Sequence, residues 1–324
     1  MKHNIKITII LLSMFVITQF IGLAVLNADI FHIEHEVNGT IQTVSNPQLS
    51  WIQPPEVETQ KQSFSILGSL IFAFIIAISL LFFLTKFKIE FVLKAWFFLV
   101  VCVALFLTIY AFEKIVPFMI NPTLAWIIPI LIALPLAFVK IFKREFLVHN
   151  FTELLIYPGI AAIFVPILNF YTILALLVII SVYDMWAVWH SGIMQKMAKY
   201  QINKLKVFSG FFIPYVSKKI KKKLKKLKKS KSKKKVRVNV ALLGGGDVIF
   251  PLITAGVILK TKIAMPFGLH EFTGGLIPAL FVIGGALLGL GCLFFFAQKK
   301  KFYPAMPFIT AGILLGMILS YLII

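Results

Sequence analysis

Residues 170–190, FYTILALLVIISVYDMWAVWH, form an apolar run that is long enough to cross a lipid bilayer as one helix. The run holds a single acidic residue, Asp184, among mostly apolar neighbours. A charged side chain at the centre of a membrane helix costs about 2.5–3.5 kcal/mol on insertion scales, so such a residue is expected to have a function. The stretch therefore predicts a membrane-spanning helix that carries a candidate functional carboxylate.

The next apolar run, residues 236–260, holds a second acidic residue within the stretch ALLGGGDVIF at 241–250. This residue, Asp247, follows three consecutive glycines, Gly244, Gly245 and Gly246. Glycine inside a helix costs about 1 kcal/mol relative to alanine, so three in a row need a reason. Close helix packing by small residues is one reason. Beside a buried aspartate we favour another, an opened backbone that lets an extended substrate approach the carboxylate.

The whole chain has the composition of a membrane protein. Of its 324 residues, 60% belong to the set AVILMFWYC and 14% are charged, whereas soluble proteins have roughly 45–50% apolar and about 25% charged residues. Nine apolar runs predict an all-α polytopic membrane protein with nine transmembrane helices. The runs are 5–26, 64–84, 91–112, 121–141, 151–168, 170–190, 236–260, 273–297 and 304–324. The first run is too long for the core of a signal peptide, and we expect it to remain as a helix.

The runs divide the chain into three parts: residues 1–190 with helices one to six, 191–237 with an amphipathic segment and a Lys-rich loop, and 238–324 with helices seven to nine. Lys and Arg concentrate in the connections on the side of the N-terminus. This asymmetry predicts a cytoplasmic N-terminus and a C-terminus on the outer side. Apart from the two aspartates, the acidic residues are assigned to loops or to the ends of the runs.

Much of the net charge of +21 comes from residues 217–237, which carry 14 basic residues and no acidic one. A solvated loop is one interpretation, and attraction of residues 218–237 to anionic lipid of the inner leaflet is the other. The preceding residues 194–215 mix apolar and basic side chains, which is compatible with an interfacial helix. Nucleic acid is not an expected partner, because the segment has neither interleaved aromatic residues nor a folded binding module.

Two carboxylates that face each other inside a membrane can share one proton, so that one is a general acid and the other a general base. Such a pair can activate a water molecule, which then attacks a peptide carbonyl. The alternative is an ion or proton-coupled transporter or leak channel that uses the same pair. Transporters of this size usually have interrupted helices in matching positions of two halves, and we see no such match. A non-catalytic scaffold leaves both aspartates unexplained.

Tyr183-Asp184 in one run and Gly244-Gly245-Gly246-Asp247 in the next match the YD and GxGD motifs of the presenilin and signal peptide peptidase family. The chain resembles these nine-span intramembrane aspartyl proteases, and is similar to a prokaryotic (archaeal-like) presenilin homologue. The resemblance implies that Asp184 and Asp247 are catalytic and that Tyr183 and the three glycines support the site. It also implies hydrolysis of peptide bonds within transmembrane segments of membrane proteins or signal peptides, with no cofactor. The sequence has no cluster of His and carboxylate residues at metal-ligand spacing, so no metal site is expected.

The third motif of the family, Pro-Ala-Leu, has two candidates in this chain. Pro278-Ala279-Leu280 is a literal match, but it opens the eighth run. Pro304-Ala305-Met306 follows a basic loop, opens the ninth run and precedes a second proline, as the motif does in the family. We therefore assign the motif to residues 304–306, where the resemblance implies a part in the substrate groove. The long lysine tail of the central loop departs from presenilins and puts presenilin-style self-cleavage there in doubt.

Overall fold

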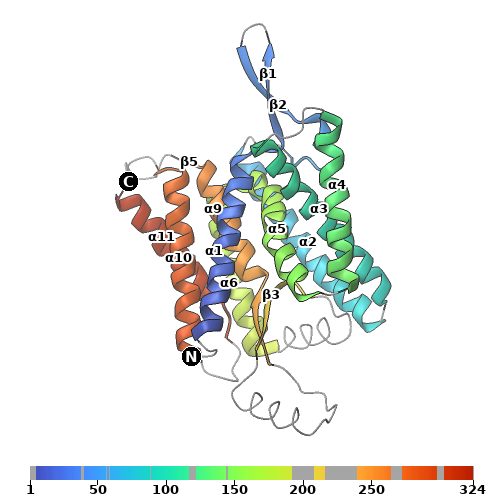
Figure 1. The fold of residues 1–324 in the computed structure, drawn as a ribbon. Coiled ribbons are helices and arrows are strands. Elements are labelled where there is room, and N and C mark those ends of the chain that lie inside the picture. Colours follow the sequence, from blue (N-terminus) through green and yellow to red (C-terminus); the bar gives the residue numbers. More distant parts are fainter. Residues whose placement is uncertain are drawn as a thin grey trace.

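The helices of this chain form one bundle, and each of the nine predicted runs contains a helix (Figure 1). The computed structural model describes residues 5–37, 40–55, 57, 59–87, 89–116, 122–143, 145–191, 208–215, 239–263, 272–297 and 303–323. Within these ranges the α-helices are α1 (Ile5–Asn27), α2 (Gln60–Lys86), α3 (Glu90–Ile115), α4 (Pro122–Phe138), α5 (Phe146–Phe164), α6 (Phe170–Trp186), α9 (Gly246–Lys260), α10 (Leu276–Phe296) and α11 (Met306–Ile323). Short turns extend three of them: a π-helix at Val139–Lys143 after α4, a 3-10 helix at Val165–Ile167 after α5, and a π-helix at Ala187–Ser191 after α6.

Among the described helices, eight are long and apolar enough to cross a membrane. The remaining one, α9, has 15 residues and begins at Gly246. The prediction of a helix over 236–260 was therefore wrong at its start. Asn239–Gly244 is a strand, β4, which pairs antiparallel with β3 (Gly210–Tyr215). Three glycines favour helix poorly. The pairing with β3 also gives the extended backbone hydrogen-bond partners, without which it could not lie within a membrane.

The strand β3 also corrects the prediction of an interfacial helix over 194–215, because its last six residues are extended. The rest of that segment, residues 194–207, and the lysine-rich residues 216–238 lie outside the described part of the chain. Two further hairpins complete the strands: β1 (His32–Val37) pairs with β2 (Thr40–Ser45), and β5 (Lys262–Ile263) pairs with β6 (Phe272–Thr273). In Figure 1 the β1–β2 hairpin extends from the end of the bundle opposite to β3, which lies at the end where α1 begins.

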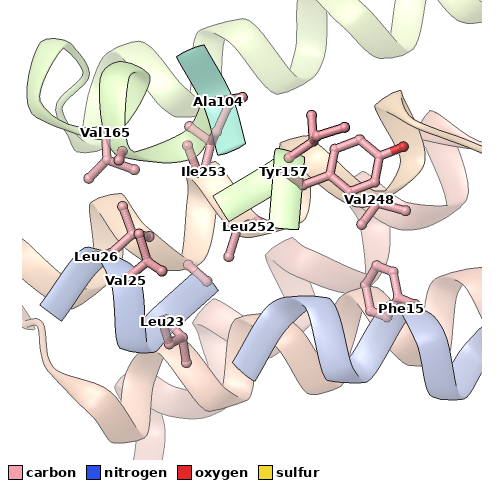
Figure 2. Packing of buried hydrophobic residues seen from close by; sticks show 14 of the residues in the cluster. Phe15, Leu23, Val25, Leu26, Ala104, Tyr157, Val165, Val248, Leu252 and Ile253 are labelled. Atoms are coloured by element: carbon pink, nitrogen blue, oxygen red, sulfur yellow. The ribbon is translucent and has the colours of Figure 1, made fainter. Parts of the chain in front are cut away.

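The core of the bundle forms where α1, α5 and α9 pack against one another. Figure 2 shows this cluster, in which Phe15 of α1 and Val248 and Leu252 of α9 are all fully buried. A polar contact fixes the same interface, because the buried side chain of Gln19 donates through Nε2 to the carbonyl oxygen of Val248 at 3.0 Å. The helix α9 is therefore held along its length by the first helix of the chain.

The helices α10 and α11 are in backbone contact along a row of glycines. A Cβ atom added to Gly285 would collide with the carbonyl of Gly312, and one added to Gly316 would collide with the carbonyl of Phe281. Small residues four apart on each helix permit this close approach, which is common between membrane helices. The position of α11, and with it the start of that helix at Met306, is consequently fixed by α10.

At the end of the bundle opposite to β3, Asp29 contacts the last turn of α9. Its Oδ1 lies 3.3 Å from Nζ of Lys260 and 3.0 Å from Nδ1 of His32. Burial on its own would raise the pKa of this carboxyl, but the hydrogen bond from His32 and the charge of Lys260 outweigh burial and hold the pKa below its ordinary value. The backbone of Asp29 has a φ of 45°, a left-handed conformation that aspartate tolerates better than most residues.

Candidate active site

Asp184 is buried near the end of α6, with 7% of its surface exposed. The start of this helix is fixed by a capping box in which Asn169 and Thr172 satisfy each other's backbone N–H groups. The α-helix ends at Trp186, and its last turn widens into the π-helical turn that begins at Ala187. Such turns are frequent at functional sites. The local sequence therefore places a carboxylate at an irregular point of a membrane helix.

The partner of Asp184 is the N-terminus of α11. The backbone N–H of Met306, the first residue of this helix, donates to Oδ2 of Asp184 at 3.0 Å. The first N–H groups of a helix have no partner within the helix, and its dipole favours a negative charge there. One turn along both helices, the hydroxyls of Ser181 and Thr310 form a second hydrogen bond at 2.8 Å. These two bonds tie α6 to α11 at the level of the carboxylate.

The two Pro-Ala candidates have different surroundings. Pro304 is buried and precedes the first turn of α11, so the segment 304–306 delivers its last N–H to Asp184. Pro278 is buried within the first turn of α10, where the absent N–H leaves no gap in the helix. Of these two segments, Pro304–Met306 is the one that provides a described hydrogen bond to an aspartate.

Asp247 is the second residue of α9 and is partly buried. The helices α6, α9 and α11 contact one another in all three pairs, so both aspartates lie on a trio of touching helices. A Cβ atom on Gly244 would lie 3.1 Å from Oδ2 of Asp247, which places that glycine beside the carboxylate.

The three glycines span the junction between β4 and α9. Gly244 ends the strand, Gly245 caps the helix with φ of −62° and ψ of −36°, and Gly246 begins the helix. The right-handed conformation of Gly245 is open to any residue. Close approach explains why residue 245 is a glycine, because a Cβ atom there would lie 2.8 Å from Oγ of Ser209 and 2.9 Å from the hydroxyl oxygen of Tyr157.

Tyr183 has 41% of its surface exposed, and its ring contacts Trp186 at a centroid distance of 6.4 Å. Among the described hydrogen bonds, none joins its hydroxyl to Asp184 or to Asp247. Its part in the site therefore rests on the motif. No group of three or more His, Cys, Asp or Glu residues that could hold a metal ion occurs in the described ranges.

Sequence reasoning missed a row of buried polar residues on α5. Glu153 was assigned to the end of a span, but α5 begins at Phe146 and the residue is 1% exposed two turns inside it. His149, Glu153 and Tyr157 follow one another at intervals of four, and Oε1 of Glu153 lies 2.5 Å from Nζ of Lys140. The interval of four is visible in the sequence. Because the predicted run began at residue 151, however, His149 was placed outside the helix and Glu153 at its end.

These features define a class of protein: a polytopic helical membrane protein with one buried and one partly buried aspartate near the ends of touching helices. The family model described as "Signal-peptide peptidase, presenilin aspartyl protease" matches residues 41–324. The chain belongs to this family. It is an intramembrane aspartyl protease and a multi-pass integral membrane protein, and its substrates are membrane proteins within the lipid bilayer.

Solved structures give the same fold. A structure of a presenilin family intramembrane aspartate protease in space group C222 has 16% sequence identity and a TM-score of 0.58, over 98% of this chain and 99% of that one. A structure of a presenilin family intramembrane aspartate protease in space group P2 has 18% identity and a TM-score of 0.55, over 97% of each chain. A comparison with curated proteins finds no match.

Proposed function

We propose that Asp184 and Asp247 are the catalytic pair, and that they hydrolyse peptide bonds within transmembrane segments of membrane proteins or within signal peptides. The hydrogen bond from Met306 to Asp184 carries the proposal, because it joins the first aspartate to the third motif of the family. The pair shares one proton, and the ionised carboxylate takes a proton from a water molecule that attacks the peptide carbonyl. The two groups titrate as a unit.

The remaining motif residues shape the access to this pair. Backbone that is not helical can lie at membrane depth only where protein or a polar cavity surrounds it. The extended residues up to Gly244 and the turn at Pro304–Ala305 are two such stretches, and both lead directly to an aspartate or its partner. We assign Gly244–Gly246 and Pro304–Met306 to the substrate groove, and Tyr183 to its support. Nothing among the described residues favours the transporter alternative.

The test is cleavage of a single-span model substrate by the purified protein in detergent, with and without a transition-state-mimicking aspartyl protease inhibitor. Asp184→Asn and Asp247→Asn should each abolish cleavage, because an amide cannot accept or donate the catalytic proton. Glu90→Gln is the matched control: it removes a carboxylate whose ion pair with Lys94, at 3.9 Å, is partly exposed and contributes little. Appreciable turnover by either aspartate variant would refute the assignment.

For topology, we propose a cytoplasmic N-terminus and an outer C-terminus. The distribution of Lys and Arg among the connections supports this orientation. It would put the lysine-rich residues 218–237 against anionic lipid of the cytoplasmic leaflet. Accessibility of single cysteines placed before α1 and after α11 to a membrane-impermeant thiol reagent would test the orientation, and labelling of the first from outside would contradict it.

A further inference from the structure

The buried polar row on α5 has no part in the chemistry proposed above. Glu153 of this row forms an ion pair at 2.5 Å with Lys140, which lies in the π-helical turn after α4. The two side chains are 1% and 4% exposed. Such a pair seldom adds stability, because removing two charges from water costs as much as their attraction returns. Ionisable residues inside membrane helices are functional candidates by default. A role for this pair therefore has to be sought in what it touches.

The row ends at the glycine junction. Tyr157, one turn after Glu153, is 2% exposed, and its hydroxyl oxygen lies where a Cβ of Gly245 would be 2.9 Å away. Figure 2 shows the ring extending from α5 toward the part of α9 that carries Val248, the residue after Asp247. The polar groups that act on this hydroxyl are Glu153, Ser209 and Asp247. The hydroxyl thus lies against Gly245, two residues before Asp247, while Glu153 of the ion pair is one helical turn back on α5.

Two polar atoms of this row lack a hydrogen-bond partner in the described structure. The hydroxyl of Tyr157 and Oε2 of Glu153 are both buried, and neither has a partner at standard hydrogen-bond geometry among the described residues. Leaving a buried polar atom without a partner is unfavourable, and native proteins do so rarely. Around catalytic groups, hydrogen bonds that are long without substrate often tighten in the substrate complex. The two atoms therefore have no fixed partner among the described residues.

The same face of α5 also fixes β3, the strand that pairs with β4 ahead of Asp247. The side chain of Asn150 donates to the carbonyl of Phe212 at 3.0 Å and accepts from its N–H at 3.1 Å. Nε2 of His149 lies 2.9 Å from the carbonyl oxygen of Gly210. Gly210 is paired in turn with Gly244. Through β3, α5 therefore positions β4, the strand before Asp247, and Gly244 beside the carboxylate.

We propose that Tyr157 is a positioning residue for Asp247, and that Glu153, held by Lys140, acts through it. The hydroxyl donates its single hydrogen bond to either Glu153 or Asp247, and the ring fixes Gly245 and with it the direction of the first turn of α9. This inference rests on the proposed catalytic role of Asp247. It assigns a role in the reaction to residues that carry none of the family's motifs.

The first test is Tyr157→Phe, which removes the hydroxyl and keeps the ring. We expect kcat to fall about 10- to 100-fold, the effect of losing one hydrogen bond to a charged group, while KM stays within about twofold because no substrate contact is lost. The matched control is Tyr110→Phe on α3, which removes another buried hydroxyl that donates to Gln48 at 2.9 Å. It should leave kcat within about twofold of the wild type.

The second test is a double-mutant cycle with Glu153→Gln. If Glu153 acts through Tyr157, the substitution should lower kcat in the wild-type chain and have little further effect in Tyr157→Phe. Because Glu153→Gln leaves the buried Lys140 without a counter-charge, the cycle is repeated with the paired change Lys140→Met and Glu153→Gln. Additive losses in both cycles would show that the pair acts independently of Tyr157, and would overturn that part of the inference.

Failure of this inference differs from failure of the proposed function. Wild-type kcat in Tyr157→Phe, together with an inactive Asp247→Asn, would overturn the positioning role and leave the catalytic pair intact. Equal losses in Tyr157→Phe and Tyr110→Phe would also overturn it, because general destabilisation would explain both. Turnover by Asp247→Asn would instead remove the catalytic role on which the inference rests.

Discussion

The hydrogen bond between Asp184 and the start of α11 allows the structural and the chemical roles of one carboxylate to be separated. Asp184→Asn keeps an oxygen that can accept from the Met306 N–H, whereas Asp184→Ala removes it. Met306 is 4% exposed and its N–H has no partner within α11, so the alanine variant leaves a buried donor unpaired. An unpaired buried donor costs about 1–3 kcal/mol. We expect the alanine variant to be less stable than the asparagine variant by this amount, and both to be inactive.

The assay is reversible unfolding in mixed micelles, read by circular dichroism, beside cleavage of the single-span substrate. Ser181→Ala is the control, because it breaks the other hydrogen bond between α6 and α11, at 2.8 Å, and keeps both carboxylates. It should lower stability by about 0.5–1.5 kcal/mol and retain cleavage. Equal stability of Asp184→Asn and Asp184→Ala would refute the reasoning, since the bond to Met306 would then contribute nothing.

Four other perturbations test the catalytic pair, the two motifs around it and the lysine-rich loop. Activity should depend on pH as a bell, falling when both aspartates are ionised and again when both are protonated, and a flat rate from acid to neutral pH would contradict a shared proton. Pro304→Ala should impair cleavage by allowing helix to form before Met306, and Pro278→Ala, in the first turn of α10, should matter much less; the reverse order would mean that the motif belongs to α10. Gly245→Ala should lower cleavage and stability, by about 1–3 kcal/mol for overpacking against Tyr157, whereas Gly284→Ala, which meets nothing within 4 Å, should leave both unchanged or raise stability. Replacing the lysines between Lys218 and Lys235 by Ser and Gly should preserve cleavage in neutral detergent and weaken binding of the chain to anionic vesicles, most clearly at low salt; lost cleavage with an intact fold would give the lysines a part in catalysis or substrate capture.

The sequence alone determined the membrane helices and marked the two aspartates. A bilayer accepts only segments whose backbone is satisfied internally and whose side chains are apolar, so each span is visible as a run of residues. Within such a run a carboxylate is conspicuous, which is why the linear pattern is enough to single out Asp184 and Asp247. The assignment of the third motif to residues 304–306 stays a prediction, which combines the resemblance with local context, a proline turn after a basic loop.

The tertiary structure decided which distant groups meet. Composition could not show that residues 239–244 are a strand, because their apolar side chains suit either state and only pairing with β3 makes the extended form stable. Composition also could not show that the N–H of Met306 donates to Asp184. Nor could it show that Glu153, one turn before Tyr157 on α5, is buried beside Lys140. These contacts join residues that the linear pattern does not relate. They exist because α5, α6, α9 and α11 pack together, and the packing of helices depends on side-chain shape over the whole bundle, which no single run encodes.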